Sequence, residues 1–223
     1  MRLDAFWRSD RWHQYERLHD GPPGARAGLL ARASWQTRVV DLSPDEATLW
    51  RGVRKSYHAT INRLTREYPD EIGQEKTRAV LCGAGAGGLI RTAQEVHRLD
   101  AGRETRPAET WDLYGDWLDD EGALLALAFD GTRGTFPERT CVGYGLFIIA
   151  DGWAYYASAA SLQRDVNIAL VWWALLVLKA RGVRWLEMGW QGQDHTEKGH
   201  GIEFFRRGFG GVDVSLTAEL PEA

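Results

Sequence analysis

Cysteine is scarce in this sequence, and this scarcity argues against a disulfide framework or a structural metal site. Only Cys82 and Cys141 occur among 223 residues, far apart and without metal-site spacing. Cys141 falls in a strand-like segment and is expected to be a core residue. The start of the chain, residues 1–12, has no apolar stretch of the kind found in signal peptides. These features predict a cytoplasmic protein with reduced thiols.

Excess positive charge and long apolar runs are absent as well. The formal net charge is −4 at pH 7, whereas nucleic-acid-binding domains are usually basic, so such binding would need a local basic patch. The longest apolar run, Ile168 to Leu178, is well short of the roughly 20 residues of a membrane-spanning helix. Two histidines lie between Asp194 and His200, but without HExxH or similar spacing. We therefore expect no membrane span, no metal and no cofactor.

The chain is organised around a stretch from Ser161 to Gly211. Its apolar run has no polar side, which predicts a central helix that is buried all round. Asp165 and Asn167 can accept hydrogen bonds from the first free amides of this helix, and Gly182 suits its left-handed end.

The segments around this helix predict the fold class. Strands are expected over residues 36–42, 123–129, 141–150, 153–158, 183–188 and 212–220, and a short helix over 201–207. Asp151-Gly152 is typical of a tight hairpin turn. A strand, a helix and a strand in close succession predict a crossover between parallel strands. The expected architecture is an α+β fold whose mixed sheet has an antiparallel meander, a central buried helix and a crossover to C-terminal strands.

The N-terminal half is expected to be mainly helical, with helices over residues 89–99 and 111–118. One long helix is predicted from Asp45 to Tyr68, with Ser43 as its N-cap and Pro44 in its first turn. This helix carries the candidates for an anion or tRNA contact, for which a solvated surface is the alternative. They are Arg54, Lys55 and Arg63.

A glycine-rich segment lies between these helices. Gly83, Gly85 and Gly88 have the spacing of a dinucleotide-binding turn. No βαβ unit closes around them, however, which favours a flexible turn.

Three C-terminal stretches resemble one family: GYGLFIIADGWAYYASAAS (143–161), NIALVWWALLVLKARGVRWLEMG (167–189) and GIEFFRRGFGG (201–211). They are similar to the C-terminal, GNAT-type acyltransferase domain of the Fem family, the aminoacyl-tRNA-dependent ligases that build peptidoglycan cross-bridges. The segment VVDLSPDEATLWRGVRKSYHATINRLTREYP (39–69) resembles the family's entry into this domain. The resemblance covers roughly residues 36–220, and its specific part is the last third.

The resemblance implies a GNAT-like sheet that splits where two parallel strands diverge, with the acyl donor entering the split beside the central helix. It implies one such domain over residues 36–223. Residues 1–35 would be an arm or remnant, too short to be the second domain of Fem ligases, so a homodimer is one way to complete the acceptor site. Arg206 takes the position of the family's lysine, which implies that it steadies negative charge during acyl transfer.

The donor is expected to be aminoacyl-tRNA, and the acceptor an amine of a peptide or small molecule. Residues 163–169 (QRDVNIA) stand where CoA-dependent relatives have a glycine-containing phosphate turn, and they contain no glycine. Two alternatives stay open: an acyl-CoA-dependent N-acyltransferase acting on a sugar or small amine, and a non-catalytic relative that binds a precursor.

Acyl transfer to an amine needs a proton acceptor and a donor for the developing oxyanion. Glu187 is the candidate general base because it is expected at a strand end facing the split; an ion pair with Arg184 or Arg206 is the alternative. Tyr155 and Tyr156 alternate along a strand, so one faces inward, either in the core or at the site. The catalytic candidates are Arg206, Glu187 and Tyr156, and the substrate-binding candidates are Trp190, Gln191, Gln193, Phe205 and Asn167.

Overall fold

A computed structural model describes residues 34–67, 78–82, 86–130, 140–191 and 196–217. Residues 1–33 of the predicted N-terminal arm, the turn glycines Gly83 and Gly85, and Gln193 lie outside these ranges, whereas residues 34–35 of that arm belong to β1. The described elements are β1 (Ser34–Asp41), α3 (Glu46–Gly52), α4 (Lys55–Glu67), β2 (Arg78–Cys82), the 3-10 helix η2 (Gly87–Leu89), α5 (Ile90–Ala101), α6 (Ala108–Asp119), β3 (Ala123–Asp130), β4 (Thr140–Ala150), β5 (Trp153–Ser161), α7 (Val166–Ala180), β6 (Trp185–Gln191), α8 (Glu197–Arg207) and β7 (Val212–Thr217).

The described strands form one seven-stranded sheet in the order β2-β3-β4-β5-β6-β1-β7. Strands β3, β4 and β5 are an antiparallel meander, as predicted. Its last hairpin turns at Asp151 and Gly152, which both have positive φ, the backbone that a tight two-residue turn requires. Strands β5 and β6 run parallel and are joined by α7, which confirms the predicted crossover. The α+β fold class with a mixed sheet is therefore confirmed.

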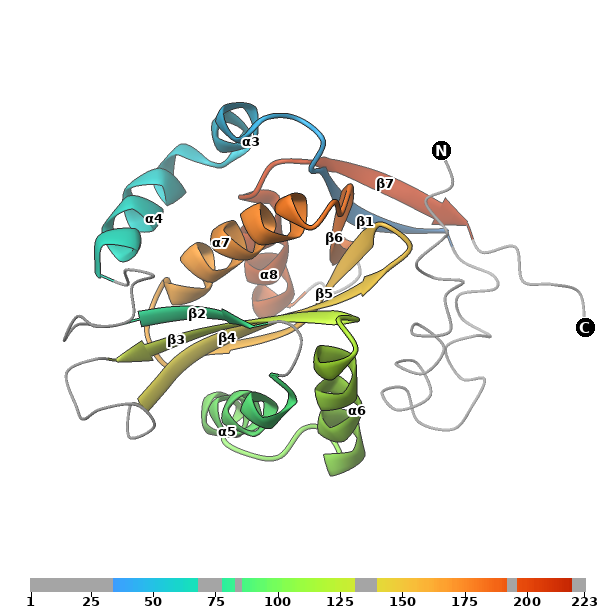
Figure 1. Ribbon diagram of the computed structural model, residues 1–223. Coiled ribbons are helices and arrows are strands. Elements are labelled where there is room, and N and C mark those ends of the chain that lie inside the picture. The colour runs from blue at the N-terminus through green and yellow to red at the C-terminus, as the bar shows by residue number, and fades with distance from the viewer. Residues whose placement is uncertain (1–33, 68–77, 83–85, 131–139, 192–195, 218–223) are drawn as a thin grey trace, which may run out of the picture.

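Helices cover both faces of the sheet (Figure 1). Helix α7 lies on one face, and its contacts with α4 place α4 over it. Helices α5 and α6 lie on the opposite face. Each face has its own cluster of buried side chains, one around α7 and one beneath α5 and α6. The sheet is thus the middle layer of three.

Helix α7 is the buried central helix that the apolar run predicted. Leu170, Val171 and Leu178 are fully buried, and Gly182 follows the helix with a φ of +79°. The beginning of the helix differs from the expectation. Asp165 is the N-cap residue, but its φ is +69° and its side chain makes no capping hydrogen bond. The cap prediction was wrong because this left-handed backbone is not the extended conformation of a side-chain cap.

The predicted long helix from Asp45 to Tyr68 is two helices, α3 and α4. Asp45, not Ser43, caps α3, and its carboxylate accepts a hydrogen bond from the Thr48 amide at 2.7 Å. The break comes at Val53, whose ψ of 139° is extended. The next amide, that of Arg54, donates to the carbonyl of Gly208 at 2.8 Å. A contact with the C-terminal part of the chain therefore interrupts the helix.

The C-terminal elements also differ in their limits from the predicted ones. Strand β6 continues to Gln191, so Trp190 and Gln191 lie in a strand and not in a loop. Helix α8 begins at Glu197, four residues before its predicted start at Gly201, and Thr196 caps it by accepting a hydrogen bond from the Gly199 amide. None of the helices among the described residues has the length and apolar character that crossing a membrane requires.

Candidate active site at the open edge of β5

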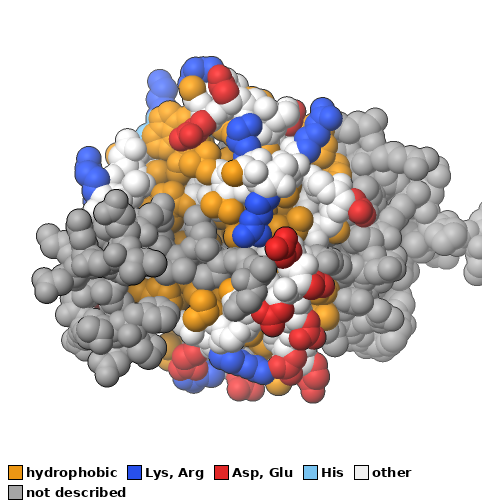
Figure 2. Space-filling model, in the orientation of Figure 1, with side chains coloured by type: hydrophobic (Ala, Val, Ile, Leu, Met, Phe, Trp, Pro, Cys, Tyr) orange, Lys and Arg blue, Asp and Glu red, His pale blue; other side chains and the backbone are white. Residues whose placement is uncertain are grey.

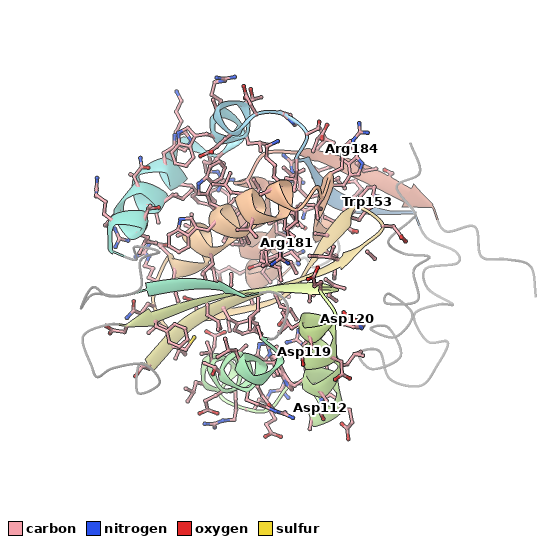
Figure 3. The ribbon with its side chains drawn as sticks, in the orientation of Figure 1. Asp112, Asp119, Asp120, Trp153, Arg181 and Arg184 are labelled. Atoms are coloured by element: carbon pink, nitrogen blue, oxygen red, sulfur yellow. The ribbon has the colours of Figure 1, made fainter. Side chains whose placement is uncertain are left out.

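Strands β5 and β6 pair over only part of their length. Their parallel pairing covers three residue pairs, from Trp153↔Trp185 to Tyr155↔Glu187. At this paired end the rings of Trp153 and Trp185 stack with centroids 5.7 Å apart; Trp153 and Arg184 mark this end in Figure 3. Beyond Tyr155 the described residues of the two strands no longer pair, and we call this second half of β5 its open edge. This is the predicted split of the sheet.

A cavity of about 1080 Å³ lies along this open edge. Its walls come from both faces of the sheet, because the described part of β6 does not run along this half of β5 to separate them. On the α7 face it is lined by Tyr57 of α4, the beginning of α7, and residues of α8. On the opposite face it is lined by the end of α5 and the segment that leads to α6. The cavity is large enough for a small-molecule ligand.

Arg206 and Gly189 form a close contact beside this cavity. A Cβ atom at position 189 would lie 2.9 Å from Nη2 of Arg206, and Gly189 has a φ of +96°. Glycine is therefore required for its positive-φ backbone, and it leaves the space that the guanidinium occupies. The pairing register of β6 with β1 skips a residue here, between Arg38↔Gly189 and Val39↔Glu187. Such a bulge re-aims the strand next to the site.

Tyr156 and Phe205 line the cavity next to Arg206. Burial raises the pKa of Tyr156 far above its ordinary value, while the charge of Arg206 acts in the opposite direction. The phenol is therefore neutral at physiological pH and is a hydrogen-bond donor, not a base. A guanidinium and a phenol together can stabilise an oxyanion on a ligand in the cavity.

A chain of polar side chains approaches the cavity from the opposite face of the sheet. The Tyr144 hydroxyl lies 2.5 Å from Ser158 Oγ and 2.7 Å from His97 Nδ1. Nη1 of Arg106 donates to Ser158 Oγ at 2.8 Å, and His97 Nε2 lies 2.7 Å from Thr105 Oγ1. Of these five side chains, all except Tyr144 line the cavity. We call these residues (His97, Thr105, Arg106, Tyr144 and Ser158) the polar chain.

The polar chain has a defined protonation state. Burial, assisted by the charge of Arg106, lowers the pKa of His97 to about 4, so this imidazole is neutral at pH 7. Burial raises the pKa of Tyr144 to about 12, although Arg106 opposes the shift. Arg106 is therefore the single charge of the polar chain at neutral pH.

The cavity as a whole carries positive charge. Among the described residues, its charged lining consists of four arginines and two aspartates, Arg103, Arg106, Arg164, Arg206, Asp100 and Asp165. With His97 neutral, four positive and two negative charges give +2, whereas the whole chain carries −4. No group of three or more His, Cys, Asp or Glu residues within the described ranges could hold a metal ion. The cavity is therefore suited to anionic ligand groups.

The structure brings four of the predicted site residues together in this cavity. Arg206, Tyr156, Phe205 and Asn167 all line it. Tyr155 packs on the opposite face, with the cluster beneath α5 and α6, so the expected alternation of the two tyrosines is confirmed. Asn167 lies in the first turn of α7, and its Oδ1 is buried without a hydrogen-bond partner in the described part of the chain.

Glu187 and Gln191 are not placed as predicted. Glu187 is 1% exposed, accepts a hydrogen bond from Thr37 at 2.6 Å and does not line the cavity. The expectation of a strand end facing the split was wrong because β6 continues to Gln191. Gln191 is also buried and donates to the Gly189 carbonyl at 3.1 Å. The side chain of Trp190 is not described.

The three predicted anion-binding residues lie away from the cavity lining. Lys55 and Arg63 are exposed on α4. The guanidinium of Arg54 lies 3.6 Å from the centroid of the Phe204 ring, and Phe204 belongs to the cavity wall. These basic residues therefore form an outer surface, next to the site but not in it.

Sequence reasoning missed the polar chain completely. Its members contribute no local motif, because His97 and Tyr144 are 47 residues apart and Arg106 and Ser158 are 52 apart. The one available signal was Ser158 itself, a polar residue on a strand of mainly apolar side chains. Cys141 is buried, as predicted, and its thiol pKa is raised to about 11 by burial.

Solved structures with this architecture include FemX, which aligns over 80% of this chain and 59% of its own, with a TM-score of 0.63 and 11% identity. The fold of this chain is therefore FemX-like. A second similar structure is L-PGS from Bacillus licheniformis; the alignment covers 82% of this chain and 59% of that one, with a TM-score of 0.55 and 13% identity.

A third structure is the C-terminal domain of a protein described as a lysylphosphatidylglycerol synthetase from Agrobacterium fabrum. The alignment covers 81% of this chain and 57% of that one, with a TM-score of 0.57 and 11% identity. This chain therefore spans less than two thirds of each of these structures. No protein-family model matches the sequence, and no curated protein matches it either. At such identities, the FemX-like fold is what the similarity shows.

Proposed function

We propose that the protein is an acyltransferase that moves an aminoacyl group from charged tRNA to an amine of a peptide or small molecule. The observation that carries the proposal is the position of Arg206, held against Gly189 and next to Tyr156, in a cavity at the open edge of β5. Supporting observations are the FemX-like fold and the name of one similar structure, a lysylphosphatidylglycerol synthetase.

The proposed reaction exchanges an ester for an amide. The neutral amine of the acceptor attacks the ester carbonyl of the aminoacyl group, and a C–N bond forms as the carbonyl oxygen becomes an oxyanion. Arg206 and Tyr156 donate hydrogen bonds to that oxyanion. The C–O bond then breaks, and the ribose oxygen of tRNA leaves with the proton that the amine has lost. Phe205 and Asn167 would hold the aminoacyl group, since both line the cavity.

The choice of tRNA over acyl-CoA rests on the beginning of α7. A CoA pyrophosphate would bind free backbone amides at the beginning of a helix. A glycine-rich turn exposes such amides because it has no side chains to block the pyrophosphate. Here residues 163–169 contain no glycine, and the carboxylate of Asp165 stands at the helix start.

The distribution of surface charge indicates the side of the molecule on which a tRNA would bind. Helix α4 carries three basic residues and one acidic residue, whereas α6 carries four acidic residues and no basic one. Figure 2 shows Asp and Glu side chains gathered at the lower right, over α6. We infer that tRNA approaches over α4, where Arg54, Lys55 and Arg63 would contact phosphates.

We also infer one GNAT-like domain over residues 36–223. A homodimer would be one source of the remaining part of the acceptor site. A cytoplasmic location fits the proposed donor, since charged tRNA is cytoplasmic. The general base, first assigned to Glu187, is not part of the proposal, because Glu187 lies outside the cavity.

The test is transfer of radiolabelled amino acid from a pool of charged tRNAs to peptidoglycan-precursor peptides and to free amines. We expect transfer by the natural protein and a loss of about 100-fold or more in Arg206→Ala, the size of effect seen when an oxyanion donor is removed.

Arg207→Ala is the matched control. Arg207 follows on the same helix, is paired with Asp213 at 3.2 Å and does not line the cavity, so its loss should leave transfer within about twofold. Equal losses in both variants would contradict the proposed role of Arg206. Transfer from acyl-CoA, with none from charged tRNA, would replace the donor.

A further inference from the structure

Arg106 has a position that the proposed acyl transfer does not use. It lines the cavity from the α5 face, whereas Arg206 lines it from α8. The cavity is thus lined by an arginine on each side of the open edge of β5, Arg106 and Arg206, besides Arg103 and Arg164. A ligand bound at Arg206 can extend around this edge towards Arg106.

Arg106 is held in place by neutral partners. Its Nη1 donates to Ser158 Oγ at 2.8 Å and lies 3.0 Å from His97 Nε2, and its guanidinium is 5.8 Å from the ring centroid of Trp111. Ser158 is itself fixed by the Tyr144 hydroxyl. A guanidinium has five N–H groups in a rigid fork, so contacts through Nη1 leave donors on its other nitrogens for a ligand.

Arg106 also lacks a charged partner in the part of the chain that the structure describes. It is half-buried, and no carboxylate among the described residues lies within ion-pair distance of it. Asp100 lines the same cavity but does not form an ion pair with Arg106. Buried charges are normally paired because removing them from water is costly. The side chains that contact Arg106, those of Ser158, His97 and Trp111, carry no negative charge.

We propose that Arg106 binds an oxyanion group, a carboxylate or a phosphate, of the acceptor. This inference rests on the proposed function, because it places the reacting amine of the acceptor beside the donor carbonyl at Arg206 and the anionic group of the acceptor at Arg106. The acceptor is then an amine that also carries a negative charge. A guanidinium can donate two parallel, coplanar hydrogen bonds to a carboxylate or a phosphate.

The test measures binding alone, without any donor. Inorganic phosphate and acetate are titrated separately into the protein by calorimetry, and the difference between them identifies the type of oxyanion. Arg106→Gln should weaken binding of the preferred anion by about tenfold or more, the value of a charged hydrogen bond. Arg106→Lys should lose less, because it keeps the charge but not the fork.

Arg98→Gln is the control for the change in charge. Arg98 is on α5, is paired with Glu95 at 2.6 Å and does not line the cavity, so affinity should stay within about twofold. Should Arg106→Gln fail to fold, Ser158→Ala tests the same site. This variant keeps the charge of Arg106 but removes the hydroxyl that positions its guanidinium, so weaker anion binding is expected as well.

Two results would overturn the inference: natural protein that binds neither anion, or binding that Arg206→Ala abolishes and Arg106→Gln leaves unchanged. The transfer assay is independent of both. Transfer without anion binding would remove the inference and keep the proposed function. Anion binding without transfer would keep the anion site at Arg106 but remove its assignment to an acceptor, together with the proposed function.

Discussion

The two faces of the sheet are packed in different ways. On the α7 face the core is continuous and apolar, with Leu170, Val171 and Leu178 fully buried. On the opposite face, large aromatic rings such as Trp111 surround the polar chain, which reaches the cavity. Both faces therefore contribute to the cavity in different ways: the α7 face adds Arg206 and Tyr156 beside an apolar core, whereas the opposite face adds a network of hydrogen-bonded polar groups.

The largest effect on stability is expected on the α7 face. Leu170→Ala removes a fully buried side chain, and the free energy of unfolding should fall by about 3 kcal/mol through lost burial and a residual cavity. The measurement is denaturant unfolding. Leu99→Ala is the control, because Leu99 is 49% exposed and its loss should cost less than about 0.5 kcal/mol. Similar losses in the two variants would contradict the assignment of α7 to the core.

The next effect distinguishes two tyrosines. Tyr144→Phe removes a hydroxyl that joins Ser158 and His97, and leaves both short of a partner, which should cost about 1–2 kcal/mol in unfolding free energy. Tyr156→Phe should cost less than about 0.5 kcal/mol, since its hydroxyl is not a link of that network, but it should slow transfer. If Tyr156→Phe were the more destabilising variant, the result would contradict the stabilising role assigned to the hydrogen bonds of Tyr144.

A smaller effect depends on pH. The folded pKa of His97, about 4, lies below the 6.5 of an ordinary histidine. Between these values the unfolded chain binds a proton that the folded chain does not, so the contribution of His97 is complete above pH 6.5 and is lost as the pH falls to 4. Allowing for solvent screening of this half-exposed group, the loss should be about 1 kcal/mol.

The measurement for His97 is the unfolding free energy of the natural protein and of His97→Gln at pH 7 and pH 4.5. Carboxylates titrate in both proteins, so only the difference between them reports on His97. The natural protein should lose more stability than the variant on acidification. An equal loss would show that His97 is not desolvated in the folded state.

The smallest effect is expected on the outer surface of α5. Arg98→Gln breaks an exposed ion pair with Glu95, and the free energy of unfolding should change by less than about 0.5 kcal/mol. Thermal unfolding at low and high salt measures it. A change as large as that of Tyr144→Phe would mean that the outside of this layer, and not its buried polar chain, stabilises it.

Much of the scaffold could be predicted from local patterns. The apolar run at 168–178 predicted α7, Asp151-Gly152 predicted the hairpin, and the motif around Arg206 predicted one end of the cavity. Each of these signals lies within a few consecutive residues. Where the prediction failed, a distant contact decided the structure.

Two failures show this. The long helix is interrupted at Val53, where the next amide donates to Gly208, a residue far along the chain. Glu187 was assigned to the site because the length of β6 could not be read from the sequence. The polar chain, assembled from three separate segments, had no local pattern at all.

The central claim is that the open edge of β5 holds the acyl donor. The most direct measurement is a crystal structure with a 3′-aminoacylamino-3′-deoxyadenosine, a non-hydrolysable mimic of the charged end of tRNA. We expect density in the cavity, with the aminoacyl carbonyl next to Arg206 and Tyr156. Density for the mimic at another surface, with the cavity empty, would contradict it.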